Sequence, residues 1–148
     1  MFVSGKWWYD KTTMFIGEYT HTVDEKNRFS LPAKFRKELG RKIVVTRGKD
    51  KCLQLFPHKT WLSISEEVRK LGHVGSDERF ARFTFSGASE IEIDSIGRIL
   101  VPEFLREFAG LNPPAGGPVV ITGVHDRVEI WNERQWTAYR KKLESEYA

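Results

Sequence analysis

One pattern of nine residues occurs twice in this chain. Residues 24–32 read Asp-Glu-Lys-Asn-Arg-Phe-Ser-Leu-Pro, and residues 94–102 read Asp-Ser-Ile-Gly-Arg-Ile-Leu-Val-Pro. The Asp, the Arg and the Pro are each displaced by 70 positions. A repeat of this kind indicates that two copies of one supersecondary unit are fused in one polypeptide.

The correspondence continues beyond this pattern with offsets of 76 and then 75 residues. It pairs Val44–Thr46 with Val120–Thr122, Leu53–Phe56 with Val128–Trp131, and Trp61 with Trp136. The offset changes at residues 111–118, where Pro and Gly indicate an inserted loop. We therefore expect a first unit at residues 14–80, which includes a connecting helix, and a second unit at residues 81–148, which ends in a C-terminal helix.

Length and composition favour one compact domain. The 148 residues are 40% hydrophobic and 13% aromatic, which is enough for a core without disulfides or metal. No run approaches the roughly 18 apolar residues that span a bilayer, and no stretch resembles a secretory leader. We expect a cytoplasmic protein without a membrane partner, in which the single Cys52 is a buried small hydrophobe.

The first 13 residues have no counterpart before the second copy, and Met14 is a plausible ancestral start. We expect residues 1–13 to be an N-terminal extension outside the fold. Its Trp7-Trp8-Tyr9 run is either a fortuitous addition or a contact with a neighbouring subunit.

The net charge of +4 is distributed unevenly. Residues 14–80 hold 14 Lys/Arg and 9 Asp/Glu, residues 81–148 hold 8 and 10, and residues 1–13 add +1. Eight of the basic residues lie between Lys34 and Lys51. Such a density attracts a polyanion, although a solvated basic surface explains it equally well.

Hydrophobic alternation and turn residues predict short strands with helices packed around them. The expected strands are residues 18–23, 28–31, 43–46, 52–56, 90–93, 98–101, 119–122 and 128–131. The expected helices are residues 33–39, 59–71, 103–108 and 133–146, with a further helix that starts at Ser76 and ends near Gly87. Asn132 is expected to cap the last helix.

The sequence offers little for catalysis or for a cofactor. The four histidines form no metal-binding pair, and the sequence has no phosphate-binding loop, dinucleotide-binding turn or nucleophile elbow. We expect neither an enzyme nor a metal or other cofactor.

The repeated Asp-x-x-x-Arg turns are the candidate site. An Asp that begins a tight turn can accept backbone N–H bonds, which leaves the Arg free to project its donors. Alternatively, each Asp and Arg form an internal salt bridge that only locks the turn. If a pseudo-twofold arrangement brings both turns to one face, their cations suit the phosphates of duplex DNA.

These residues resemble the MraZ family of bacterial transcription regulators. The resemblance rests on the Met14–Tyr19 segment, on the two Asp-x-x-x-Arg turns with their Pro residues, and on Gly87–Glu90 before the second turn, and it covers residues 14–148. It implies an α+β, mainly β fold in which two SpoVT-AbrB swapped-hairpin repeats form one pseudo-twofold β-barrel with peripheral helices. It also implies a nucleoid-associated ring-shaped homo-oligomer. That oligomer would bind direct repeats of double-stranded DNA in the promoter of the division and cell-wall gene cluster, which includes its own gene.

The resemblance also assigns roles to individual residues. Arg28, Arg98 and Lys26 match the DNA-contacting positions, and Asp24 and Asp94 match the acids that fix the loops. Asn27 replaces the usual Gly before the first Arg, and Ile96 leaves the second turn without its own Lys. Asn tolerates a left-handed backbone, so we expect the first turn to survive. Each Arg contacts either a guanine edge or a phosphate.

Two other functions compete with DNA binding. One is an oligomeric protein-binding module, as in antitoxin-like relatives of the hairpin fold. The other is an RNA-binding protein or a barrel-fold enzyme. Phe80 and Phe83 share one helical face, which predicts a place in the core or at a subunit interface, and Trp61, Trp131 and Trp136 are expected to pack.

Overall fold

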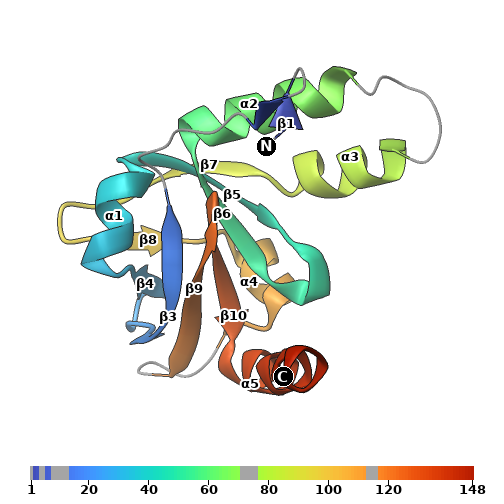
Figure 1. The fold of residues 1–148 in the computed structure, drawn as a ribbon. Helices are drawn as coiled ribbons and strands as arrows, with labels where there is room; N and C mark the ends of the chain where they lie inside the picture. Colours follow the sequence, from blue (N-terminus) through green and yellow to red (C-terminus); the bar gives the residue numbers. More distant parts are fainter. Residues whose placement is uncertain (1, 4–5, 8–13, 71–76, 113–116) are drawn as a thin grey trace.

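The two copies of the repeat build the same series of elements in the computed structural model, which describes residues 2–3, 6–7, 14–70, 77–112 and 117–148 (Figure 1). The first series is β3 (Phe15–Thr22), β4 (Arg28–Ser30), α1 (Ala33–Leu39), β5 (Lys42–Arg47), β6 (Leu53–Pro57) and α2 (His58–Lys70). The second is β7 (Ser89–Glu92), β8 (Arg98–Leu100), α4 (Glu103–Ala109), β9 (Pro118–His125), β10 (Arg127–Asn132) and α5 (Glu133–Tyr147). The remaining elements are β1 (Phe2–Val3), β2 (Lys6–Trp7), the 3-10 helix η1 (Lys49–Lys51) and α3 (Asp77–Ser86).

The expected helices are confirmed to within a residue or two at their described ends. The first helix begins directly after Pro32, whose fixed φ suits a helix start, and ends before Gly40 at φ 79°. Asn132 caps α5 as expected, because its side-chain oxygen accepts a hydrogen bond from the N–H of Gln135 at 3.2 Å. The predicted helix start at Ser76 lies outside the described residues.

The described strands form three sheets, one of them the short β1–β2 pair, and all of their pairings are antiparallel. The larger sheet has the order β3-β9-β10-β6-β5-β7, and β4 pairs with β8 in a separate two-stranded sheet. These ladders do not join into one closed sheet among the described residues. The expected α+β, strand-rich class is therefore confirmed, whereas the expected closed barrel is not.

Each copy exchanges strands with the other. The first strand of copy one, β3, pairs with β9 of copy two, and the first strand of copy two, β7, pairs with β5 of copy one. The two exchanges use corresponding positions, since His21 lies opposite Val119 and Ile91 lies opposite Ile43. Neither copy therefore completes its sheet without the other.

The pairing register shows an approximate twofold relation between the copies. Phe29 lies opposite Ile99, its counterpart 70 residues later. Gln54 lies opposite Glu129, its counterpart 75 residues later. A strand position can lie opposite its own repeat counterpart only if a twofold axis passes between the two, so the axis crosses the molecule at both of these pairs.

Both copies contribute to one hydrophobic core. The fully buried side chains include Phe29 and Phe35 from the first copy and Ile99 and Leu105 from the second. The ring of Phe35 packs edge-on against those of Phe15 and Tyr19, with centroid distances of 5.7 and 5.2 Å. The two copies therefore form one folding unit.

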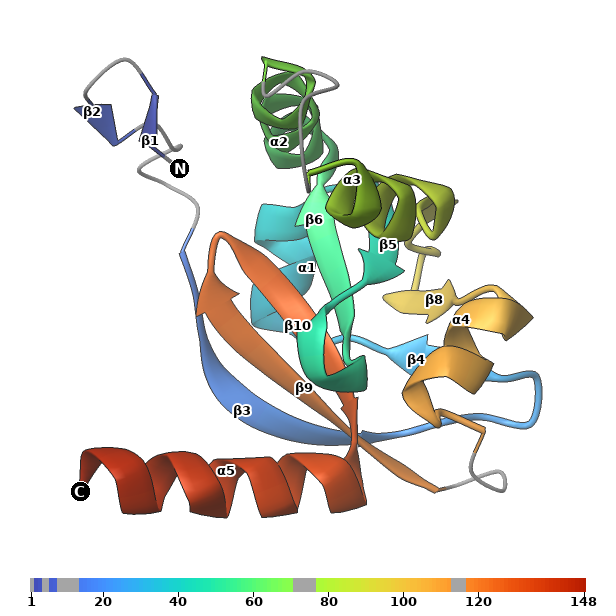
Figure 2. The same cartoon turned by 90° about the vertical axis from the view of Figure 1, so that its right-hand side faces the viewer.

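The aromatic side chains outside this core divide into packed and exposed groups. Trp131 packs against Trp136 at 5.2 Å between ring centroids, and Trp61 packs against Phe56 at 5.8 Å, as expected. Phe80 and Phe83 on α3 are 49% and 36% exposed. Because α3 lies on the outside of the sheet (Figure 2), these two phenylalanines are not core residues, and the other predicted place, a subunit interface, stays a prediction.

Two further predictions concern Cys52 and the membrane. Cys52 is buried, and burial raises the pKa of its thiol, so it behaves as the expected small hydrophobe. No helix in the described part of the chain combines the length and apolar character needed to cross a bilayer.

Candidate functional site

The first loop, residues 24–28, is organised around one carboxylate. Asp24 Oδ1 accepts hydrogen bonds from the backbone N–H groups of Lys26 at 2.8 Å and Arg28 at 2.9 Å. Asp24 Oδ2 accepts a third bond from Arg28 Nε at 2.8 Å. The side chain of Asp24 thus fixes both the backbone of the turn and the base of the guanidinium group.

The second loop, residues 94–98, repeats this arrangement. Asp94 Oδ1 accepts from the N–H groups of Ile96 at 3.1 Å and Arg98 at 2.8 Å, and Oδ2 accepts from Arg98 Nε at 2.9 Å. Asp94 thus holds the backbone of the second turn as Asp24 holds that of the first.

Each loop needs one residue in the left-handed region. Asn27 has φ 61°, and its counterpart Gly97 has φ 86°. Asn adopts this conformation at lower cost than most residues with a Cβ. The first loop therefore forms the same turn despite the replacement of Gly.

The β4–β8 pair joins the two loops, which project from the same side of the molecule (Figures 1 and 2). Arg28 lies opposite Leu100 and Arg98 lies opposite Ser30, so these four side chains share one face of the ribbon. The intervening Phe29 and Ile99 are buried on the other face. The ribbon thus holds the two arginines at diagonal positions of one face, on either side of the buried Phe29–Ile99 pair.

An ion pair also links the loops. Arg98 Nη1 lies 3.6 Å from Asp24 Oδ2, so Asp24 faces both arginines. The N–H of Arg28 and then its guanidinium hold the pKa of the Asp24 carboxyl below its usual range, and Arg98 does the same for the pKa of Asp94. Both carboxylates are therefore ionised at neutral pH.

This geometry can be compared with the two hypotheses for the Asp-x-x-x-Arg turns, an arginine that contacts a ligand and an internal salt bridge that only locks the turn. The internal salt bridges exist, and they reduce the positive charge of the loops. The side chains of Arg28 and Arg98 are still 29% and 25% exposed. Nε of each guanidinium is used within its own loop, and Arg98 Nη1 also pairs with Asp24 of the first loop. The Nη groups of Arg28 and Nη2 of Arg98 remain for a ligand. Locking the turn and contacting a ligand are compatible roles for these arginines.

The surroundings of the two loops differ in charge. Lys26 and Lys34 of the first copy are exposed. Their counterparts are the exposed Ile96 (59%) and Phe104 (48%). The charge asymmetry of the sequence therefore occurs at the candidate site itself.

Sequence reasoning missed Arg36, which lies on α1 of the first copy and reaches the second loop. Its Nη1 donates a hydrogen bond to the carbonyl oxygen of Ile96 at 3.1 Å. The repetition of Pro-x-x-x-Arg at positions 36 and 106 is a signal for this residue, although the sequence does not show which loop the arginine contacts.

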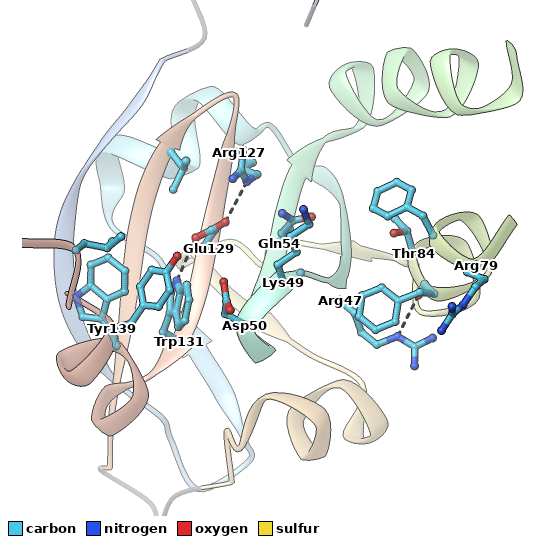
Figure 3. Close-up of a pocket in the computed structure, with 16 residues that line it drawn as sticks. Arg47, Lys49, Asp50, Gln54, Arg79, Thr84, Arg127, Glu129, Trp131 and Tyr139 are labelled. Carbon is cyan, nitrogen blue, oxygen red and sulfur yellow. Dashed lines mark hydrogen bonds and ion pairs between the residues drawn. The ribbon is translucent and has the colours of Figure 1, made fainter. Parts of the chain in front are cut away.

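A second concave region is built from other elements. A groove of about 1170 Å³ lies between η1, α3, β10 and α5 (Figure 3). Arg47 lies over the ring of Phe83 at 4.9 Å and donates from Nε to the carbonyl oxygen of the same residue at 3.1 Å. On the other wall, Glu129 accepts hydrogen bonds from Arg127 and Trp131. Arg47 on one wall and Glu129 on the other are thus both held by partners within the protein.

The described residues contain no cluster of three or more His, Cys, Asp or Glu side chains that could hold a metal ion. The candidate site remains the loop pair, which brings two arginines and two carboxylates together.

Comparison with known proteins identifies the family. A family model described as "MraZ protein, putative antitoxin-like" matches residues 14–83 and again residues 84–147. Proteins named "Transcriptional regulator MraZ" from Syntrophomonas wolfei and Carboxydothermus hydrogenoformans are 46% and 47% identical over 135 residues, which cover 90% of this chain and 92% of each relative. A protein of the same name from Clostridium tetani is 46% identical over 127 residues, or 85% of this chain and 87% of the relative. The chain belongs to the MraZ family.

Proposed function

We propose that this protein is a transcription regulator that binds DNA sequence-specifically through its paired loops. Its targets would be direct repeats in the promoter of the division and cell-wall gene cluster, which includes its own gene. The observation that carries the proposal is the β4–β8 ribbon, which holds the partly exposed Arg28 and Arg98 at diagonal positions of one face. The names of the relatives support the regulatory role.

The ribbon has a suitable form for duplex DNA. The major groove admits a two-stranded β-ribbon, and arginine Nη groups can bind a guanine edge or a phosphate. The exposed Lys26 of the first loop and Lys34 of α1 would bind phosphates and orient the protein. Asp24 and Asp94 would hold both guanidinium groups in place, so fewer rotamers need to be ordered on binding.

The proposal extends to fold and assembly. Residues 14–80 and 81–148 would be two AbrB-like repeats, and their exchanged strands would form a pseudo-twofold barrel. Several such subunits would form a ring in the cytoplasm, associated with the nucleoid. A ring gains avidity on direct repeats only when the repeat spacing matches the subunit spacing. The exposed Phe80 and Phe83 beside the groove provide apolar surface for contacts between subunits.

Fluorescence anisotropy with the DNA upstream of the protein's own gene tests the proposal against a control in which the repeats are scrambled. We expect preference for the native repeats. The logarithm of the association constant should fall linearly with the logarithm of the salt concentration, with a slope of about −0.9 per neutralised phosphate. The Arg28→Ala/Arg98→Ala variant should lose this binding. Arg134→Ala/Lys141→Ala, which removes two exposed cations from α5, is the matched control and should bind almost normally.

Substitution by lysine separates base contact from phosphate contact. Arg28→Lys keeps the charge but loses the bidentate fork. A selective loss of affinity for the native repeats would indicate base contact, and an equal, small loss on both DNAs would indicate phosphate contact. Salt-insensitive or absent binding by the unaltered protein would refute the proposal and favour a protein-binding platform.

A further inference from the structure

The second loop is held by the opposite copy at two points. Arg36 Nη1 donates to the carbonyl oxygen of Ile96 at 3.1 Å, and the N–H of Leu31 donates to the carbonyl oxygen of Gly97 at 3.0 Å. The Arg36 guanidinium lies directly against Gly97, since a Cβ built at that residue would be 2.1 Å from Arg36 Nη1 and 2.3 Å from Cδ and Cζ. The contact exists only because position 97 has no side chain.

The repeat counterpart of Arg36 behaves differently. Arg106 donates from Nε to the carbonyl oxygen of Val101 at 3.0 Å and from Nη1 to Asn112 Oδ1 at 2.9 Å, both within its own copy. The counterpart of Gly97 is Asn27, which carries the Cβ that Gly97 lacks. An arginine placed against Asn27 as Arg36 is placed against Gly97 would collide with that side chain.

Arg36 is held at some cost. Its Nε is buried and has no hydrogen-bond partner among the described residues. A buried donor without a partner lowers stability. The position of this guanidinium is therefore explained by its contact with the second loop rather than by full satisfaction of its own hydrogen bonds.

We propose that Arg36 is a positioning residue that fixes the second loop for DNA binding, and that Asn27 keeps the first loop free of the equivalent contact. We call the contact of Arg36 with Ile96 and Gly97 the arginine clamp. The second loop is preorganised by the clamp, whereas the first loop, with its exposed Lys26, adjusts to the DNA. The role in DNA binding rests on the proposed function; the clamp itself does not.

The test measures hydrogen exchange of the free protein and DNA affinity in parallel. Arg36→Ala removes the clamp together with its charge. Gly97→Asn expels the guanidinium but keeps that charge, and Asn27 shows that Asn fits this turn at φ 61°. Arg106→Ala is the matched control, because it removes the corresponding arginine, which contacts its own copy.

We expect both clamp variants to exchange the amides of residues 96–98 faster, without a change at residues 26–28. Their affinity for the native repeats should fall by about threefold to tenfold, the range expected when one side chain or loop is no longer preorganised. The double variant should be no weaker than either single one, since all remove the same contact. Arg106→Ala should leave the exchange of both loops unchanged.

Three results would overturn parts of this inference. Unchanged exchange at residues 96–98 in both variants would refute the clamp, even if DNA binding is normal. A loss of DNA affinity in Arg36→Ala but not in Gly97→Asn would make Arg36 a direct DNA contact instead of a positioning residue. Faster exchange in both variants of a protein that binds no DNA would refute the DNA role and the proposed function together, while the clamp would stand.

Discussion

The two loops have the same internal chemistry and different surroundings. In both, one Asp accepts two backbone N–H bonds and the Nε–H of the Arg four residues later. Outside the turn, the first loop carries Lys26 and faces no arginine clamp, whereas the second carries Ile96 and is held by Arg36. The hydrogen bonds that define the turn are therefore the part the two copies still share, and the outward positions differ.

The two copies also differ in what their last helices contact. On α5, Trp136 Nε1 donates to Glu18 at 2.8 Å and thereby ties the last helix to the start of β3. On α2, the counterpart Trp61 packs against the ring of Phe85 on α3 at 5.3 Å. The three residues after Phe15 belong to a strand, while their counterparts after Phe85 end a helix and form a turn. One copy has thus replaced strand pairing with helix packing.

The largest effect is expected at the pair where the two copies meet. Phe29 and Ile99 are both almost fully buried and lie opposite each other. Phe29→Ala should lower the free energy of unfolding by about 3–5 kcal/mol because it leaves a cavity in the shared core, and Ile99→Val by about 0.5–1.5 kcal/mol. Chemical denaturation measures both. Two separate unfolding transitions in either variant would contradict a single shared core.

The next largest effect is expected when either loop carboxylate is removed. Asp24 faces both arginines and Asp94 faces one, so Asp24→Ala should disturb both loops and Asp94→Ala mainly the second. Amide exchange at residues 26–28 and 96–98 reports the difference. If Asp24→Ala accelerates exchange at residues 26–28 alone, the ion pair between Asp24 and Arg98 has no role in holding the second loop.

Acid should lower the stability of the protein by protonating Asp24 and Asp94. The pKa values of Asp24 and Asp94 are lowered in the native protein, so the ionised carboxylates stabilise it. Their contribution is complete above the ordinary Asp pKa of 3.8 and is lost as the pH falls through the lowered native pKa. Asp24→Asn/Asp94→Asn should be less stable at neutral pH and lose less stability on acidification. Parallel curves of unfolding free energy against pH, from about pH 6 to pH 2, would show that these two acids do not contribute.

The sequence predicts the repeated turns well because their chemistry is local. An Asp that bonds N–H groups two and four residues later needs no partner from elsewhere, and the same holds for the Asn132 cap. The exchange of β3 and β7 between copies, and the choice of Arg36 but not Arg106 to contact a loop, depend on residues distant in the chain. The sequence does not decide between a core and an interface position for Phe80 and Phe83, because a helical stripe of apolar residues has the same pattern whether it faces a core or a groove.

The smallest effect concerns one charge on each loop. Lys26 and Ile96 occupy corresponding exposed positions, so Lys26→Ile and Ile96→Lys should change stability by no more than about 0.5 kcal/mol. If both loops lie against DNA, Lys26→Ile should reduce the salt slope by about 0.9 and Ile96→Lys should raise it by a similar amount. The double variant Lys26→Ile/Ile96→Lys should restore the original slope, because it moves the charge from the first loop to the clamped second loop. A slope that responds only to position 26 would mean that the first loop alone approaches the phosphates. The clamped second loop would then serve to hold Arg98 and Asp24 in place rather than to attract DNA.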